Sequence, residues 1–127
     1  MQRIIVAHHS HELANNLKDA LENEWEIHVC TDSYPVADML HYLKPDALVI
    51  DLNLHPKDGL TVLDENRLNL PPVILAMTNL VSPYILNTAE ALGIGCVVRI
   101  PCSTAYIKEQ LRELIDNTQG GHYGYHL

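Results

Sequence analysis

The chain has 127 residues, of which 47% are hydrophobic and 19% are charged, and its formal net charge is −8. This length fits one domain with a sufficient hydrophobic core, and the composition argues against a disordered or fibrous protein. The acidic balance disfavours direct binding to nucleic acid or to an anionic membrane, because the few dispersed cations cannot form a basic patch.

The cysteines Cys30, Cys96 and Cys102 are odd in number and show no Cys-x-x-Cys spacing. They indicate reduced thiols rather than a disulfide framework or a zinc knuckle. No signal peptide precedes the first apolar segment, and no apolar run is long enough to span a bilayer. We therefore expect a cytoplasmic protein.

Short apolar runs typical of strands buried on both faces recur along the chain. They comprise residues 4–7, 47–50, 73–77 and 96–98. Residues 27–29 alternate apolar and polar side chains, as a strand with one exposed face would. These segments predict five strands.

Segments with helical spacing separate the predicted strands. We expect helices after Ser10, from 33 to 44, from 59 to 68, from 82 to 92, and after Ser103 or Thr104. Ser10 and the Ser82-Pro83 pair are residues that favour helix starts, and the inward stripes of the first and fourth helices include Leu13 and Leu86. Alternation of strands with helices predicts an α/β fold with a parallel sheet covered on both faces.

We assign residues 1–117 to this domain and residues 118–127 to a flexible tail or the start of a linker. His122 and His126 in the tail have the spacing of helical metal ligands, but the surrounding glycines argue against a helix there. In parallel α/β folds, sites form beyond the carboxyl ends of the strands. At these positions the sequence has His8-His9, Asp51, Thr78-Asn79 and Arg99-Ile100-Pro101.

The segment from Asp51 to Gly59, with Thr78 and Pro101 after later strands, resembles the receiver domain of bacterial two-component response regulators. The resemblance covers residues 3 to 117. It implies a flavodoxin-like (βα)5 three-layer sandwich with a central five-stranded parallel sheet of strand order 2-1-3-4-5. It also implies a phosphoacceptor at Asp51, a partner histidine kinase or effector domain, a cis peptide bond before Pro101, and a role in phosphorelay signal transduction and transcription regulation.

The resemblance further assigns roles to the residues around Asp51. In the family, two acidic residues after the first strand bind Mg²⁺ together with the acceptor and a backbone carbonyl, which here belongs to Asn53. A hydroxyl at the position of Thr78 and a lysine just before the proline bind the phosphoryl oxygens. Mg²⁺ prefers oxygen ligands, and cations stabilise the charge of phosphoryl transfer.

Several of these positions are substituted in this sequence. The acidic pair falls on His8 and His9, the lysine falls on Ile100, and the aromatic switch position falls on Val97. Arg99 is displaced by one residue from the lysine position, and alternation along a strand turns it to the other face. Since loss of one electrostatic stabiliser of a transition state slows a reaction about 10²- to 10³-fold, we expect impaired phosphorylation at Asp51. We also expect weak or absent Mg²⁺ binding, no cofactor and no catalytic residues.

The histidines admit three interpretations. In the first, the two histidines point to opposite sides and one of them reaches Asp51. This His–Asp pair would keep Asp51 ionised and raise the pKa of the imidazole. Alternatively His8 or His9 binds Zn²⁺ with Asp51, with His55 as a further candidate, or both are solvent-exposed.

Tyr84, Arg99, Tyr106 and Arg112 are candidates for one exposed protein-interaction surface, because Tyr and Arg are enriched at interface hot spots. In receivers, the face formed by the fourth helix, the fifth strand and the fifth helix commonly makes homodimers or contacts effector domains. The alternative is a solvated face with incidental aromatic residues.

The sequence is therefore interpreted as an atypical receiver, or pseudo-receiver, that acts as an interaction or dimerisation module and not as an enzyme. One alternative is a working phosphorelay receiver that accepts phosphate on Asp51 to regulate transcription. Another is a metal-sensing site at His8, His9 and Asp51. Mg²⁺-dependent labelling and tight Zn²⁺ binding would distinguish the three.

Overall fold

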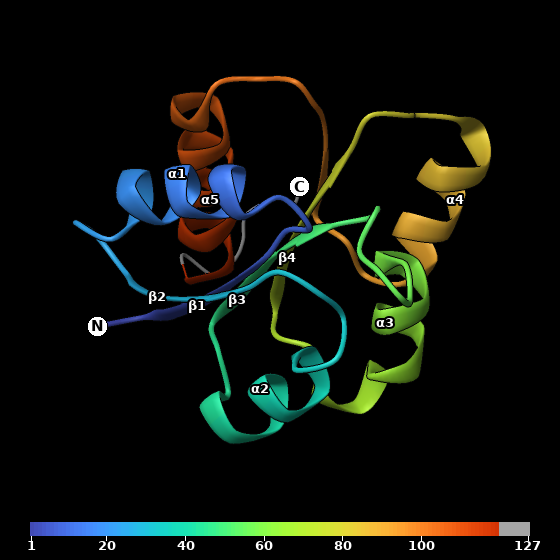
Figure 1. The fold of residues 1–127 in the computed structure, drawn as a ribbon, viewed down its shortest axis with the longest axis horizontal. Coiled ribbons are helices and arrows are strands. Elements are labelled where there is room, and N and C mark those ends of the chain that lie inside the picture. The colour runs from blue at the N-terminus through green and yellow to red at the C-terminus, as the bar shows by residue number, and fades with distance from the viewer. Residues whose placement is uncertain (120–127) are drawn as a thin grey trace.

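The computed structural model describes residues 1–119. Its centre is one parallel sheet of five strands in the order β2-β1-β3-β4-β5 (Figure 1). The strands are β1 (Arg3–Ala7), β2 (Glu26–Cys30), β3 (Ala47–Asp51), β4 (Val73–Thr78) and β5 (Cys96–Arg99). The predicted flavodoxin-like sandwich and its strand order are confirmed.

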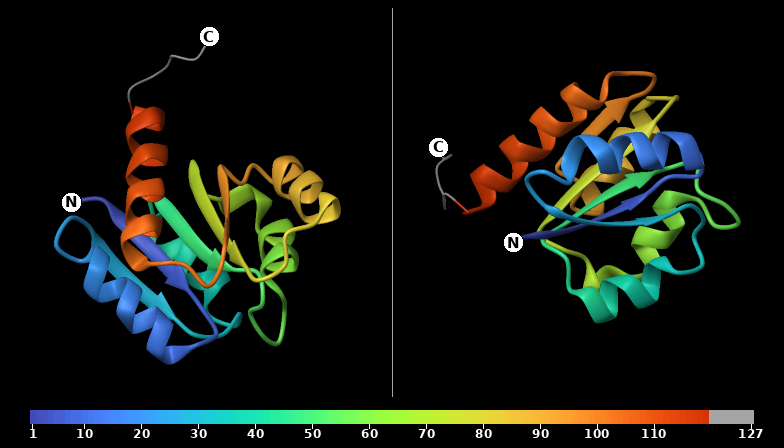
Figure 2. Two further views of the ribbon diagram at one scale, coloured as in Figure 1. Left: turned by 90° about the horizontal axis from the view of Figure 1, so that it is seen from above. Right: turned by 60° about the vertical axis from the view of Figure 1, so that its left-hand side comes forward.

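Helices cover both faces of the sheet and give the fold three layers (Figures 1 and 2). They are α1 (His11–Leu21), α2 (Val36–Leu43), α3 (Gly59–Glu65), α4 (Pro83–Ala91) and α5 (Thr104–Gln119), with a short 3-10 turn η1 (Arg67–Asn69) after α3. Helices α1 and α5 pack on one face, where Leu17 and Leu111 join the same core cluster. Helices α2 and α3 pack on the other face through Leu40 and Leu63.

The sheet supplies both core clusters because successive side chains of a strand point to opposite faces. In β1, Ile4 and Val6 belong to the α1–α5 cluster, whereas Ile5 and Ala7 belong to the other. All five residues of β3 are buried. This double burial explains the continuous apolar runs in the sequence.

Three serines begin helices as expected. Ser10, Ser82 and Ser103 each accept a hydrogen bond through the hydroxyl from the backbone N–H three residues later, at 3.2, 3.2 and 3.1 Å. Pro83 follows Ser82 at the first helical position, where its missing N–H costs nothing. These caps fix the loops that follow the carboxyl ends of β1, β4 and β5.

Two helix boundaries differ from the prediction. Helix α2 begins at Val36 rather than Ser33, because Ser33 is held in the loop: its hydroxyl accepts the N–H of Lys57 at 3.0 Å. Helix α3 ends at Glu65 rather than 68, and the side chain of Asn66 donates to the carbonyl of Val62 at 2.7 Å.

The predicted inward stripes were partly wrong. Leu13 and Leu86 are 44% and 48% exposed. The inner face of α1 is centred on Ala14, Leu17 and Leu21, which turns Leu13 towards its margin. In α4 only Ala89 is buried.

Helix α5 is described from Thr104 to Gln119 and includes residues 118 and 119 of the proposed tail. The rest of the proposed tail, with His122 and His126, lies outside the described residues. Among the residues that the structure describes, none of the helices has the length and apolar character needed to cross a membrane.

Candidate functional site

Asp51 is the last residue of β3 and is fully buried at the carboxyl edge of the sheet. Its Oδ1 accepts the backbone N–H of Asn53 at 2.8 Å, and its Oδ2 accepts the backbone N–H of His9 at 3.2 Å. These charge-assisted bonds hold the carboxylate between the loops that follow β1 and β3.

His9 lies directly over this carboxylate. Its Nδ1 contacts Asp51 Oδ2, and its side chain remains 41% exposed. On its other side the ring meets that of exposed His55, with ring centroids 5.9 Å apart at an interplanar angle of 71°. His9 therefore contacts both the carboxylate of Asp51 and the ring of His55.

His8 lies beneath His9 and is buried, with 1% of its surface exposed. The two rings stack with centroids 5.1 Å apart, and His8 Nδ1 is 3.6 Å from Asp51 Oδ2. The same Nδ1 accepts the N–H of Ser10 at 3.0 Å, which places the proton of the neutral ring on Nε2. Burial lowers the pKa of His8 despite the opposing attraction of Asp51, with His9 adding to the decrease.

The expectation that the histidines point to opposite sides was wrong, because both rings face Asp51. They follow Ala7, the last residue of β1, so the alternation of strand side chains no longer applies to them. The expected rise in the imidazole pKa was also wrong for His8, since burial outweighs the carboxylate.

Within residues 1–119, the basic side chains within 4 Å of the Asp51 carboxylate are those of His8 and His9. Lys57 lies in the following loop but pairs with Glu65 at 2.8 Å. Arg99 is exposed at the end of β5. The carboxylate thus has no lysine or arginine partner in the part of the chain described.

Thr78 and Ile100, which match the phosphoryl-binding positions, contribute little polar chemistry beside Asp51. Thr78 is buried, and its hydroxyl donates to the carbonyl of Leu80 and accepts its N–H, both at 3.1 Å. Ile100 packs against the α1–α5 core cluster. The Ile100–Pro101 peptide bond is cis, as the resemblance implied. His55–Pro56 is a second cis bond that was not predicted.

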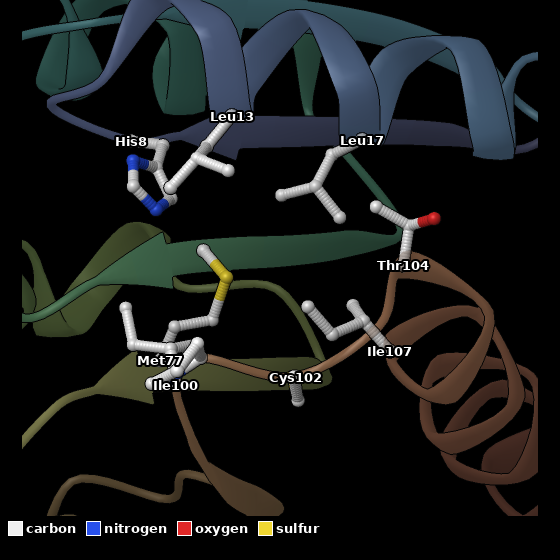
Figure 3. A pocket seen from close by; sticks show the side chains of 9 residues that line it. His8, Leu13, Leu17, Met77, Ile100, Cys102, Thr104 and Ile107 are labelled. Carbon is white, nitrogen blue, oxygen red and sulfur yellow. The ribbon is translucent and has the colours of Figure 1, made fainter.

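A cavity of about 80 Å³ lies beside His8 and Ile100 (Figure 3). It is lined by His8, Leu13, Leu17, Met77, Ile100, Pro101, Cys102, Thr104 and Ile107. His8 lies at one end of this mainly apolar space. Sequence reasoning identified only His8, Ile100 and Pro101 here, because the others carry no motif and come together only through the packing of α1, β4 and α5.

Asn53 and Thr78 instead border a second, more polar hollow of about 330 Å³ between the loops that follow β3 and β4. The side-chain amide of Asn53 donates to Asn79 Oδ1 across it at 3.3 Å. Tyr84 lines the same hollow. The predicted pocket residues are therefore divided between two cavities: His8, Ile100 and Pro101 line the first, and Asn53 and Thr78 line the second.

The four interface candidates do not share one environment. Tyr84 and Tyr106 are 71% and 48% exposed, and Arg99 is exposed. Arg112 turns to the other side of α5, where its Nη2 is 2.5 Å from Glu24 Oε1. The hydrogen bond from Arg112 lowers the pKa of Glu24. Arg112 thus joins α5 to the segment after α1.

The donor set does not fit Mg²⁺. The groups that converge are two imidazole nitrogens and one carboxylate oxygen, from His8, His9 and Asp51. Mg²⁺ requires near-octahedral coordination by oxygen, whereas imidazole suits transition metals.

Solved structures share this architecture over almost the whole chain. The receiver domain of the Francisella response regulator 1452 superposes with a TM-score of 0.83 and 19% identity, covering 93% of this chain and 99% of that one. A CheY-like response regulator receiver domain protein from Methanospirillum hungatei gives a TM-score of 0.88 at 14% identity, covering 96% and 99%. The chain therefore has the fold of response-regulator receiver domains.

Curated proteins that resemble this receiver domain are named protein-glutamate methylesterase/protein-glutamine glutaminase. The relative from Caldanaerobacter subterraneus subsp. tengcongensis is 28% identical over 117 residues, covering 90% of this chain and 32% of that protein. The one from Sulfurimonas denitrificans is 29% identical over 124 residues, covering 92% and 35%. The chain thus spans about a third of the length of these relatives. No protein-family model matches the sequence.

Proposed function

We propose that this receiver domain is a degenerate one that acts as a protein-interaction module in signal transduction, with impaired Mg²⁺-dependent phosphorylation at Asp51. The observation that carries the proposal is the setting of Asp51, a buried carboxylate that has the imidazoles of His8 and His9, and no lysine or arginine, beside it within residues 1–119. The domain itself is proposed to be non-enzymatic and cytoplasmic.

Phosphorylation would add negative charge at a carboxylate that lacks the usual cations. Burial lowers the pKa of His8, which disfavours its charged form, and Ile100 offers no charge. Transfer of a phosphoryl group depends on positioning and on electrostatic stabilisation by metal ions and cationic side chains. Their replacement by His8, His9 and Ile100 supports loss of the ordinary switch.

The partner surface is proposed to lie on α4, β5 and the start of α5. Tyr84, Tyr106 and Arg99 are exposed there, and aromatic and arginine side chains are enriched at protein interfaces. The partner would be a histidine kinase, an effector domain or a second copy, bound without phosphorylation. Arg112 is left out of this surface because it pairs with Glu24. Control of transcription would act through such a partner, without direct contact between this domain and nucleic acid or membrane.

The test is phosphorylation by acetyl phosphate, with and without Mg²⁺, read as a change in intact mass. The matched variant restores the family residues through His8→Glu, His9→Asp and Ile100→Lys in one chain. We expect no phosphate on the natural chain under conditions that label a competent receiver, and Mg²⁺-dependent labelling of the restored variant. Asp51→Asn in the restored chain should abolish that label.

A phosphate on the natural chain that requires Mg²⁺ and disappears in Asp51→Asn would refute the proposal. The domain would then be a working phosphorelay receiver.

A further inference from the structure

The His8–His9–Asp51 cluster brings three metal-ligating atoms together at the carboxyl edge of the sheet. Two imidazole nitrogens and one carboxylate oxygen all lie within 4.8 Å of one another. Zinc ligands lie about 2.0 to 2.2 Å from the metal, so two ligands of one tetrahedral site are roughly 3.3 Å apart. The 3.6 Å separation of His8 Nδ1 from Asp51 Oδ2 is close to that spacing.

No hydrogen bond joins His8 Nδ1 to Asp51 Oδ2, because neither of these two atoms carries a proton. His8 Nδ1 accepts the N–H of Ser10 and therefore has no proton to give to Asp51. Two acceptor atoms consequently face each other at 3.6 Å in side chains that are 2% and 0% exposed. Each atom already accepts one backbone N–H, that of Ser10 for His8 Nδ1 and that of His9 for Asp51 Oδ2. A cation beside both would add an attraction for two acceptors that now face each other.

We propose that His8, His9 and Asp51 bind a divalent transition metal of the Zn²⁺ type in place of Mg²⁺. Asp51 Oδ2 is the first ligand. His9 Nδ1, which contacts it directly here, becomes the second by moving apart to admit the ion, and His8 Nδ1 becomes the third by giving up the N–H of Ser10. His55 is placed to approach as the fourth, because it is exposed and its ring already meets that of His9 at 5.9 Å. This site does not depend on the interaction role proposed above.

The selectivity follows from the ligand types. Nitrogen donors favour Zn²⁺, Co²⁺ or Ni²⁺ over Mg²⁺, and a set of four ligands suits a tetrahedral metal. Replacement of the acidic pair by histidines therefore changes the metal that the same strand ends select, rather than only weakening the site.

The experiment is titration of the full chain with Co²⁺, followed by its visible absorption, and then competition with Zn²⁺ or excess Mg²⁺. Cys102→Ser, His122→Ala and His126→Ala are introduced throughout to remove other candidate ligands. We expect one Co²⁺ per chain with the intense visible bands of tetrahedral coordination. Zn²⁺ should displace it and excess Mg²⁺ should not.

Variants locate the metal. His9→Ala and Asp51→Asn should each weaken Co²⁺ binding by more than the roughly 10- to 100-fold that loss of an outer-shell partner costs. His8→Gln, which retains a polar side chain of similar size, should weaken it less because His8 must first release Ser10. His55→Ala should weaken binding and shift the visible bands, because water would replace the fourth ligand. His28→Ala is the matched control, since His28 pairs with Glu26 on β2, away from the cluster.

Circular dichroism on every variant separates loss of metal binding from loss of fold, and His8→Gln and His55→Ala provide tests that do not alter Asp51. The proposal is overturned if the chain binds no Co²⁺. It is equally overturned if folded His9→Ala and Asp51→Asn chains bind Co²⁺ as tightly as the unsubstituted cluster, or if Mg²⁺ displaces Co²⁺ as readily as Zn²⁺ does.

Discussion

The centre of the sheet is more deeply buried than the side of the molecule formed by α4 and β5. Every residue of β3 is buried, whereas β5 has one buried residue in four, and α4 buries only Ala89. Tyr84 and Leu86 on α4 are exposed. The centre therefore supplies the stability and holds Asp51 in place, while the α4–β5 side keeps large side chains on the surface, where a partner would contact them.

The reactivity of the cysteine thiols should differ most between the interior of the domain and its α4–β5 side. Burial raises the pKa of Cys30 from 9.0 to about 12, which lowers its thiolate fraction about 10³-fold. Cys102, after β5, is exposed. Alkylation of the native protein with iodoacetamide, followed by peptide mass spectrometry, should modify Cys102 first and leave Cys30 unmodified until unfolding. Equal rates would show that the end of β2 is open to solvent.

Leucine truncation compares the packing of the two regions. Leu48 in β3 is fully buried, so Leu48→Ala should lower the free energy of unfolding by about 2 to 5 kcal/mol. Leu86→Ala on α4 makes the same chemical change at a side chain that is 48% exposed, and should cost under about 1 kcal/mol. Urea unfolding of both variants measures the difference. Similar losses would contradict the contrast between the centre and the α4–β5 side.

Two glycines extend the comparison to the backbone. A Cβ on Gly59 would lie 2.8 Å from the carbonyl oxygen of Asp51 and 2.8 Å from the Cα of Leu52, which are backbone atoms that cannot easily move. Gly59→Ala should therefore destabilise the fold by about 1 to 3 kcal/mol. Gly95→Ala, before β5, meets only the end of the Leu114 side chain at 2.9 Å and should cost less. The midpoints of thermal unfolding test this order.

The smallest expected effect is that of Tyr84→Ser. Because Tyr84 is 71% exposed, its loss should change the free energy of unfolding by only about 0.5 kcal/mol or less. The same variant should weaken self-association or binding to a partner if α4 lies in an interface, as sedimentation or a binding titration would detect. A large loss of stability would mean that Tyr84 packs into the domain instead.

Much of the fold follows from local sequence patterns. Strands buried on both faces, such as β3, have to be apolar throughout, and Ser10, Ser82 and Ser103 can cap a helix through local hydrogen bonds alone. Helix bounds were less predictable where tertiary contacts intervene. Ser33 resembles a helix start, but its hydroxyl accepts the N–H of Lys57 in a distant loop.

The residues that gather around Asp51 could be named from the sequence, but their arrangement could not. The family resemblance implied the acceptor position for Asp51 and placed His8 and His9 at the substituted acidic pair. Their stacking over one carboxylate could not be read from the sequence, because residues beyond a strand end no longer follow its alternation. The cavity beside His8 depends on Met77 and Ile107, which are distant in sequence and carry no polar signal.

The hydroxyl of Thr78 has a consequence for switching. Both of its hydrogen bonds go to the backbone of Leu80. Turning it towards Asp51 would break both, at a net cost of about 0.5 to 1.5 kcal/mol each, with no phosphoryl group to compensate. On the proposal that Asp51 is not phosphorylated, these two bonds favour the one arrangement of the loop described here. Occupancy of a partner would then follow the concentrations of the two proteins, as for a fixed scaffold.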